Sequence, residues 1–359
     1  MMKKNILVTG GAGFIGTNFI YHALKIRPAW QITNLDALTY AGNPANFDNL
    51  PDESAKRHMF VHGDIKDKNL INKLFKEKKF NGIIHFAAQS HVDRSIQDPE
   101  IFVDTNIVGT QRLLDASYRY WKDSFLPADF RFLHVSTDEV YGSLGKNGFF
   151  TETTPYNPSS PYSASKAASD HLVRAYFKTY DFPTLITNCS NNYGHYQFPE
   201  KFIPLMILNL LEQKSLPVYG NGENVRDWLY VIDHCDALVT VFEMGKPGET
   251  YNIGGNSERK NIEIAHALCD FFDKTVKIYA ENSSRNLIRF VKDRPGHDLR
   301  YAIDASKIKE ELGWTPKFSF EKALEDTVRW YLSNKKWVKS VKSGEYRKWI
   351  KASYGKTYL

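Results

Sequence analysis

Short apolar runs alternate with amphipathic stretches along the first half of the chain. The apolar runs have the length of strands and cover residues 6–8, 31–35, 58–65, 82–88 and 130–135. The clearest helical pattern extends from Pro99 to Trp121, where apolar residues recur roughly every three to four positions. Strands that alternate with helices in this way predict an α/β fold with a Rossmann-type, doubly wound parallel sheet.

The alternation breaks after Tyr193 and Gly194, where Pro, aromatic and basic residues become more frequent. We therefore predict a Rossmann-type domain over residues 1–194 and a smaller carboxyl-terminal α/β lobe over residues 195–359. Further elements are expected as a helix at 199–211, an extended run at 217–219 and strands at 230–233 and 251–254.

Three glycines follow the first strand at the spacing of a dinucleotide-binding turn. Gly10 permits a tight turn, Gly13 lets the backbone approach a pyrophosphate, and Gly16 allows the next helix to pack on the strand. The second strand ends at Asp36, where a carboxylate accepts hydrogen bonds from ribose hydroxyls and repels a 2′-phosphate. These residues predict NAD rather than NADP.

Later strand ends could contact the same cofactor. Asp64 follows the third predicted strand and could meet the adenine. Ala87 and Ala88 end the fourth, and their small side chains let the backbone lie near a cofactor. His91, in the polar loop that follows, is either a ligand contact or a structural residue.

Five polar residues gather at a strand end and at a helix start. Thr137, Asp138 and Glu139 follow the strand at 130–135, at the edge where open α/β sheets bind ligands. Tyr162 and Lys166 come just after a Ser-Pro helix start and lie on one helix face. Lys166 and a cationic nicotinamide would lower the pKa of the Tyr162 phenol, which could then take a hydroxyl proton as hydride leaves the same carbon.

Asp138 and Glu139 add a pair that alcohol oxidation does not need. Two adjacent carboxylates in a cleft can separate their pKa values, so that one holds a proton while the other is ionised. Such a pair suits the removal of water, with an acid for the leaving hydroxyl and a base for the carbon proton. The alternative is a solvated acidic turn after the strand.

Composition narrows the class of protein. The 359 residues are 42% hydrophobic, and the formal charge of +6 comes from dispersed Lys and Arg. The tail at 335–351 mixes basic and aromatic residues, but no nucleic-acid motif accompanies it, so we expect a packed helix with a solvated basic face.

The compartment follows from the cysteines and from the absence of targeting signals. Cys189, Cys235 and Cys269 lack the spacing of paired cysteines, the first strand leaves no room for a signal peptide, and no apolar run could span a bilayer. We therefore expect a cytoplasmic protein, and one without a metal site.

A set of motifs, taken together, resembles the dTDP-glucose 4,6-dehydratase family of the extended short-chain dehydrogenase/reductase superfamily. The motifs lie at residues 10–16, 36 with 39–43, 90–96, 136–142, 162–166, 188–194, 198–201, 225–228, 251–255 and 293–298. They extend from the first strand to the carboxyl-terminal half.

The resemblance implies an NAD-dependent hydro-lyase that makes dTDP-4-keto-6-deoxyglucose from dTDP-glucose with tightly held, unconsumed NAD. Tyr162, assisted by Thr137, would remove the sugar 4-hydroxyl proton as the C4 hydride passes to NAD. Glu139 would take the C5 proton and Asp138 would protonate the departing 6-hydroxyl. The hydride would then return to C6.

The resemblance also supplies candidate ligand contacts. Those for NAD are Gly10, Gly13, Phe14, Ile15, Gly16, Asp36, Leu38, Thr39, Asp64, Ile65, Ala87, Ala88, Ser90, Thr105, Tyr162, Lys166 and Asn191. Those for the nucleotide sugar are His91, Thr137, Asn191, Lys201, Phe202, Pro217, Tyr219, Arg226, Asn261, Arg294, His297 and Asp298. A guanidinium fork matches phosphate oxygens, so Arg226 and Arg294 would hold the diphosphate.

Two expectations about assembly come from the same resemblance. Segments near 228–255 would return to the first domain, so that the boundary is interleaved. The chain would form a homodimer through the helices near 100–121 and 163–180.

Alternatives stay open at this point. The family usually has Glu at Gln89 and Pro at His195, which puts substrate preference or rate in question. A UDP-glucose 4,6-dehydratase would share the mechanism, whereas a 4-epimerase needs no acid and base pair after Thr137. A silent NAD-sensing protein typically loses the Tyr or Lys that stand here at 162 and 166.

Overall fold

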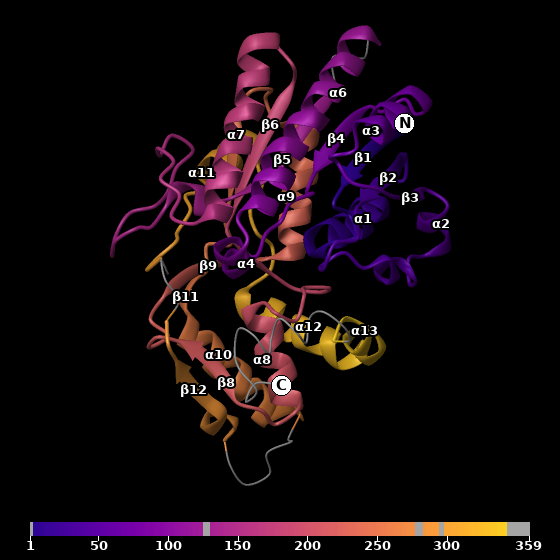
Figure 1. Cartoon of the computed structure of the whole chain (residues 1–359). Coiled ribbons are helices and arrows are strands. Elements are labelled where there is room, and N and C mark those ends of the chain that lie inside the picture. Colours follow the sequence, from indigo (N-terminus) through magenta and orange to yellow (C-terminus); the bar gives the residue numbers. More distant parts are fainter. Residues whose placement is uncertain (1–2, 125–129, 277–282, 294–297, 343–359) are drawn as a thin grey trace.

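The computed structural model describes residues 3–124, 130–276, 283–293 and 298–342, which form a large α/β unit above a smaller lobe (Figure 1). The large unit is built on a seven-stranded, parallel sheet with the order β10-β6-β5-β4-β1-β2-β3. Its strands are β1 (Lys4–Thr9), β2 (Trp30–Asp36), β3 (His58–His62), β4 (Gly82–His85), β5 (Arg131–Thr137), β6 (Thr184–Cys189) and β10 (Thr250–Ile253). The predicted Rossmann-type sheet is confirmed.

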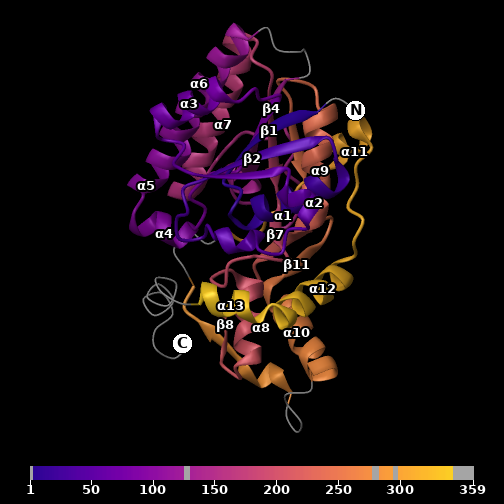
Figure 2. The ribbon, with the colours of Figure 1, turned by 90° about the vertical axis from the view of Figure 1, so that its right-hand side faces the viewer.

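Helices cover both faces of this sheet (Figure 2). One face carries α3 (Lys68–Glu77), α6 (Thr110–Asp123) and α7 (Pro161–Tyr180), and the other carries α1 (Phe14–Ile26), α9 (Val231–Met244) and α11 (Ser306–Leu312). Neighbouring residues on a strand point to opposite faces. Accordingly, Ile6 and Val8 pack with Phe19 of α1, while Leu7 packs with Leu113 of α6.

The lobe contains two small sheets and a group of helices. One sheet has the order β11-β9-β7, with β11 (Glu258–Lys260), β9 (Val225–Tyr230) and β7 (Asn191–Tyr193), and the other pairs β12 (Ile288–Val291) with β8 (Leu216–Tyr219). The helices are α8 (Phe202–Leu211), α10 (Asn261–Phe271), α12 (Phe320–Ser333) and α13 (Lys335–Val341).

Shorter helical segments connect these elements. They are α2 (Asp52–Ala55), α4 (Val92–Gln97), α5 (Glu100–Phe102), 3₁₀ turns at Pro44–Phe47, Asp138–Tyr141 and Ser284–Leu287, and π-helical turns at Val103–Gly109 and Phe272–Val276. The helix expected from Pro99 to Trp121 is therefore present but contains a π turn.

One predicted strand is wrong. Of the residues at 230–233, only Tyr230 belongs to a strand, because α9 begins at Val231. Periodicity alone cannot separate a fully buried helix from a buried strand, and α9 is buried on most sides. The strand expected at 251–254 is β10, which pairs with β6 in the large sheet.

The boundary between the two domains, expected after residue 194, stays a prediction. The path of the chain between the large sheet and the lobe is relevant to it. The segment from α9 to β10 lies with the large sheet, while β9 before it and β11 after it lie in the lobe.

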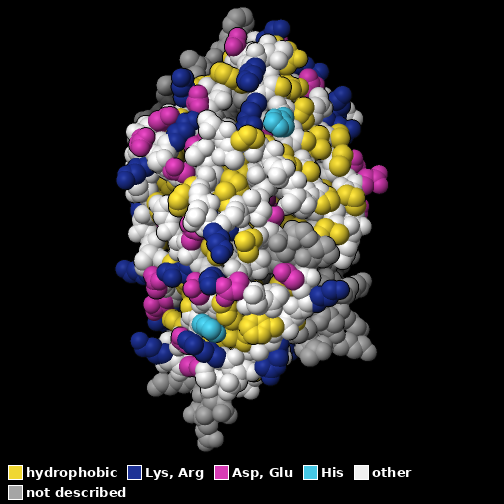
Figure 3. Space-filling model, turned by 90° about the vertical axis from the view of Figure 1, so that its left-hand side faces the viewer, with side chains coloured by type: hydrophobic (Ala, Val, Ile, Leu, Met, Phe, Trp, Pro, Cys, Tyr) yellow, Lys and Arg dark blue, Asp and Glu magenta, His cyan; other side chains and the backbone are white. Residues whose placement is uncertain are grey.

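Charged side chains of both signs are interspersed on the face drawn in Figure 3. Within the described residues, no helix combines the length and the apolar character needed to cross a membrane.

Candidate active site

A cavity of about 310 Å³ lies at the carboxyl ends of the parallel strands. Candidate residues that line it are Gly10, Gly13, Phe14, Ile15, Gly16, Asp36, Thr39, Asp64, Ile65, Ala87, Ala88, Ser90, Thr105, Thr137, Asp138, Glu139, Tyr162, Lys166, Asn191 and Lys201. Candidates outside its lining are Leu38, His91, Phe202, Pro217, Tyr219, Arg226, Asn261 and Asp298. Arg294 and His297 lie outside the described residues.

The glycine turn is shaped by the close approach of two strand ends. Gly10 has a φ of +72°, and a Cβ there would lie 2.6 Å from the backbone nitrogen of Ala87. A Cβ on Gly16 would collide with the Gly10 carbonyl. Gly13 caps α1 without a side-chain hydrogen bond, and the first turn of α1 holds no acidic residue. The free amides of that turn therefore fit a phosphate.

Asp36 stands at the end of β2 with its carboxylate oriented by the backbone. Its Oδ2 accepts a hydrogen bond from the Ala12 amide and its Oδ1 accepts one from the Leu38 amide, both at 2.8 Å. Burial raises the pKa of Asp36, while these two amides oppose the rise. A carboxylate oxygen has more than one lone pair, so both oxygens can still accept from ribose hydroxyls. Together with the glycine turn, Asp36 makes the cavity fit NAD.

Thr137 closes β5 and starts the 3₁₀ turn that holds the two acids. Its hydroxyl accepts a hydrogen bond from the Glu139 amide at 3.3 Å and donates to Asp138 Oδ1 at 3.3 Å. Asp138 is only 2% exposed. Its other oxygen, Oδ2, has no hydrogen-bond partner among the described residues.

The pKa of Asp138 is raised well above its ordinary value. Burial is the main cause, and the charges of Glu139 and Asp227 add to it, while Arg226 opposes it. Burial and the neighbouring charges therefore favour the protonated form of Asp138, next to a second carboxyl group.

Tyr162 and Lys166 are placed by the amino-terminal turn of α7. Ser160 and Ser163 form a capping box, with Pro161 at the first helical position. Tyr162 is 8% exposed and Lys166 is 3% exposed, and both line the cavity. The Lys166 ammonium donates to the Val135 carbonyl at 2.9 Å.

The sequence predicts that Lys166 and a cationic nicotinamide lower the pKa of Tyr162, but its surroundings in the protein raise it. Burial raises the pKa of Tyr162 well above its ordinary value, and Glu139 adds to the rise, while a hydrogen bond with Thr137 opposes it. Burial lowers the pKa of Lys166 to about 8, against the opposing charge of Asp170. Burial and the nearby carboxylate thus favour the neutral phenol, and ionisation of Tyr162 needs positive charge close by.

Candidate substrate residues near the cavity form a polar rim. Lys201 lines it and donates to the Ser90 carbonyl at 3.3 Å. His91 lies behind the lining, 3.6 Å from the carboxylate of Glu200. Glu200 lines the cavity, is buried, and has its pKa raised by that burial. The loop expected at 90–95 is mostly helix, because α4 begins at Val92. The residues just before α4 and just before α8 therefore meet at one side of the cavity.

The other candidate substrate contacts described in the lobe lie outside the lining of the cavity. Arg226 on β9 donates to the Asp298 carbonyl at 2.9 Å and lies over the Tyr301 ring at 4.4 Å. The Asp298 carboxylate accepts from Ser159 at 2.7 Å. Pro217 and Tyr219 lie on β8, and Asn261 begins α10.

Asn106 was missed by sequence reasoning. It lies in the π turn, where its amide accepts from the Gln89 backbone nitrogen at 2.8 Å and donates to the Gln89 carbonyl at 3.0 Å and to Ser165 at 2.8 Å. It therefore ties the end of β4 to α7. A polar residue on the buried side of an amphipathic helix was the available signal.

The two departures from the family pattern occupy different places. Gln89 lines the cavity. His195 does not; its Nε2 lies 2.7 Å from Asp326, and its ring stacks on Trp330.

Comparison with known proteins gives consistent matches over nearly the whole chain. The family described as GDP-mannose 4,6 dehydratase matches residues 7–327. The dTDP-glucose 4,6-dehydratase of Xanthomonas campestris pv. campestris strain B100 is 56% identical over 344 residues, which is 95% of this chain and 97% of the relative. The dTDP-glucose 4,6-dehydratase 1 of Escherichia coli K12 is 53% identical, covering 97% of this chain and 98% of the relative.

A solved structure agrees with these relatives. The dTDP-glucose 4,6-dehydratase of Bacillus anthracis, in complex with NAD, superposes with a TM-score of 0.84 at 47% identity. The match covers 94% of this chain and 100% of the Bacillus anthracis chain.

Proposed function

The chain belongs to the family of dTDP-glucose 4,6-dehydratases, and we propose that the residues of its cavity divide the steps of that reaction among them. The protein is an NAD-dependent hydro-lyase that converts dTDP-glucose to dTDP-4-keto-6-deoxyglucose and water. The observation that carries this function is the 56% identity to a dTDP-glucose 4,6-dehydratase over 95% of the chain. The acid pair beside Tyr162 supplies the chemistry that a dehydratase needs.

NAD would be held by the glycine turn and the ends of the first strands. The free amides at the start of α1 would bind the pyrophosphate, and Asp36 would accept from the adenosine ribose hydroxyls. When bound, NAD supplies the hydride acceptor for the sugar C4 and later the hydride donor for C6.

Tyr162 is the base for the sugar 4-hydroxyl in this proposal. Thr137 shares a hydrogen bond with the phenol and so orients it. Lys166 places an ammonium one helical turn away, and this positive charge favours the phenolate. Tyr162 thereby takes the hydroxyl proton when C4 is oxidised.

Asp138 and Glu139 take the two roles in water loss. The 4-ketone acidifies the C5 proton, which Glu139 removes as the base. Asp138 holds its proton because it is buried, and it gives this proton to the departing 6-hydroxyl. One partly buried and one buried carboxyl at the same turn suit these opposite tasks.

The lobe would bind the nucleotide part of the substrate. We assign contacts with dTDP-glucose to the candidate residues named above, including Arg294 and His297, which lie outside the described residues. Arg226 and Arg294 would meet the diphosphate. The same reasoning gives the lobe to residues 195–359, with segments near 228–255 returning to the NAD domain.

Assembly and compartment complete the proposal. A homodimer would form through the helices near 100–121 and 163–180, where Ile101, Val103 and Tyr180 are exposed. Cys189, Cys235 and Cys269 are all buried free thiols, which supports a reducing cytoplasm.

The test is turnover of dTDP-glucose and of UDP-glucose, side by side, by purified protein without added NAD. We expect a 4-keto-6-deoxy product from dTDP-glucose, detected by its mass, and little from UDP-glucose. Product from UDP-glucose alone would keep the mechanism and replace the substrate. No product from either, by protein that still binds NAD, would revive the silent binding protein.

A further inference from the structure

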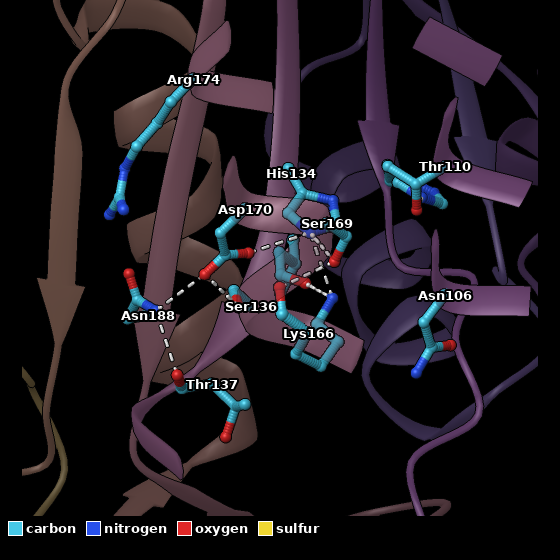
Figure 4. Close-up of polar contacts among 12 residues, drawn as sticks. Asn106, Thr110, His134, Ser136, Thr137, Lys166, Ser169, Asp170, Arg174 and Asn188 are labelled. Atoms are coloured by element: carbon cyan, nitrogen blue, oxygen red, sulfur yellow. Dashed lines mark hydrogen bonds and ion pairs between the residues drawn. The ribbon is translucent and has the colours of Figure 1, made fainter. Parts of the chain in front are cut away.

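A connected group of buried polar side chains surrounds the lysine of the active site (Figure 4). The Lys166 ammonium lies 3.2 Å from Nε2 of His134, and the same imidazole nitrogen lies 3.2 Å from Oδ1 of Asp170. His134 comes from β5, whereas Lys166 and Asp170 are one turn apart on α7. His134 is 1% exposed and Asp170 is 0% exposed, so solvent reaches neither side chain.

Asp170 is held as an ionised carboxylate inside the protein. Its Oδ2 accepts hydrogen bonds from the Ser136 hydroxyl at 2.8 Å and from the Tyr156 hydroxyl at 2.9 Å. Burial alone would raise the pKa of Asp170, but interactions with His134, Lys166 and Ser136 outweigh it and the pKa is lowered. A buried carboxylate of this kind needs a compensating positive charge, and Lys166 supplies it.

His134 stands between the two charges and is itself neutral. Burial is the main cause that lowers its pKa to about 4. A neutral imidazole carries a proton on one nitrogen only, and the Nδ1 of His134 has no hydrogen-bond partner within the described part of the chain. Nε2 can therefore accept from Lys166 or donate to Asp170, but not both. The tautomer of His134 is thus coupled to the protonation of Lys166.

We propose that His134 and Asp170 are positioning residues for the dehydratase reaction: the His134 imidazole accepts from the Lys166 ammonium and holds it in place, and the charge of the buried Asp170 carboxylate keeps Lys166 protonated. This inference rests on the role proposed above for Lys166. Among the described groups around Lys166, Asp170 has the largest effect against the desolvation of the ammonium, so without this carboxylate Lys166 loses its proton at a lower pH.

The other titratable groups around this cluster do not provide that charge. His85 of β4 lies with its ring 5.1 Å from that of His134, and its pKa is lowered well below its ordinary value by burial, so it is neutral. Burial raises the pKa of the Cys189 thiol to about 12. The remaining groups that face Asp170 are Tyr141 and Tyr156, whose pKa values burial raises, and Arg174, which donates to the Tyr156 hydroxyl at 2.7 Å.

The test uses the whole enzyme with Asp170→Asn. Carbon-13 NMR of lysine-labelled protein follows the titration of Lys166, whose signal is identified by its loss in Lys166→Met. A second readout is the pH dependence of the single-turnover reduction of bound NAD by dTDP-glucose. We expect the Lys166 titration and the alkaline limb of this rate to move to lower pH by about one unit or more, the usual effect of removing an opposite charge nearby.

Two substitutions of the bridging residue separate positioning from packing. The amide of His134→Gln can accept from Lys166 and donate to Asp170, so it should keep the alkaline limb close to that of the unaltered enzyme. His134→Phe keeps a ring of similar size but removes the nitrogen that accepts from Lys166, and it should move the limb to lower pH. If Asp170→Asn fails to fold, the difference between His134→Gln and His134→Phe still tests the proposal, which is wrong if both variants have the same alkaline limb.

Tyr156→Phe is the matched control, because it removes one hydrogen bond to Asp170 without changing a charge. We expect it to lower stability and leave the Lys166 titration in place. The proposal is wrong if Asp170→Asn leaves that titration unmoved, or if Tyr156→Phe moves it equally. Lack of turnover by the unaltered enzyme would count against the proposed function alone, since the NMR titration needs no substrate.

Discussion

Tyr162 and Asp138 show how burial gives two groups of one cavity the same tendency to hold a proton, although the reaction uses them in opposite directions. Desolvation raises the pKa of both. In the proposed mechanism, Asp138 needs that proton, because it would act as an acid. Tyr162 would have to lose its proton, so the positive charge of Lys166 would matter for the phenol in a way that it does not for the carboxyl.

Tyr162→Phe tests the assignment of the base. The ring and its packing remain, but the proton acceptor is lost, so we expect reduction of bound NAD by dTDP-glucose to become undetectable in a rapid-mixing absorbance measurement. Tyr120→Phe is the control, because it removes a hydroxyl that bonds the Phe80 carbonyl away from the cavity. Turnover near that of the control would remove Tyr162 from the role of base.

The acid pair makes a separate prediction. Asp138→Asn combined with Glu139→Gln removes the acid and the base of water loss but leaves Tyr162 and Lys166 unchanged. We expect bound NAD still to be reduced on mixing with dTDP-glucose, while no 6-deoxy product forms. Mass spectrometry of the quenched sugar nucleotide checks this, and a normal yield of 6-deoxy product would contradict the assignment.

At the residue scale, the sequence predicts groups that are neighbours in the chain better than groups that packing brings together. Thr137, Asp138 and Glu139 are consecutive, and all three line the cavity as expected. His134 and Asp170 gave no such signal, because their contact depends on how α7 packs on β5. Arg226 was expected from its chemistry, yet it lies outside the lining, where it contacts backbone carbonyls.

At the scale of elements, the glycine turn between β1 and α1 is the feature most closely specified by its residues. Gly10→Ala puts a Cβ against the backbone of Ala87 and requires a side chain at φ +72°. We expect the free energy of unfolding to fall by more than about 1 kcal/mol and the purified protein to retain less NAD. Denaturant unfolding and nucleotide absorbance measure the two effects.

Gly145→Ala serves as the control for that substitution. A Cβ on Gly145 meets no atom within 4 Å, so the same chemical change should leave both stability and NAD content unaltered. Equal losses in the two variants would show that the close approach of Gly10 to Ala87 does not matter.

The sequence predicts an element well where its hydrophobic pattern and its end signals are local. It fails where an element is buried on most sides, because the pattern then no longer separates a helix from a strand. Glycine, acidic or small residues lie at or just after the ends of the first strands, such as Gly10, Asp36 and Ala87, and they indicated where these strands end. By contrast, α9 begins with Val231 and Ile232, β-branched residues that favour a strand, and only packing against α1 and the sheet makes this segment a helix. The π turn at Val103–Gly109 likewise contains Asn106, whose hydrogen bond with Gln89 no periodicity reveals.

At the scale of the whole molecule, the last described helix returns to the first turn of the chain. Trp337 on α13 donates from its indole to Asn46 Oδ1 at 2.6 Å. The Asn46 amide in turn donates to the Ala12 carbonyl at 3.0 Å and to Thr17 at 2.9 Å, next to the glycines that would bind the pyrophosphate. The carboxyl-terminal helix therefore supports the NAD site, although it lies far from it in sequence.

Trp337→Phe tests that support. The substitution keeps an aromatic ring but removes the hydrogen bond to Asn46, which is worth about 1 kcal/mol for a neutral pair. We expect NAD to bind up to about fivefold more weakly, the equivalent of that energy, in calorimetric titration of nucleotide-free protein. Trp314→Phe is the matched control, because the buried Trp314 indole has no hydrogen-bond partner among the described residues and does not line the cavity. An equal effect of both substitutions would mean that α13 supports the fold in general and not the dinucleotide turn in particular.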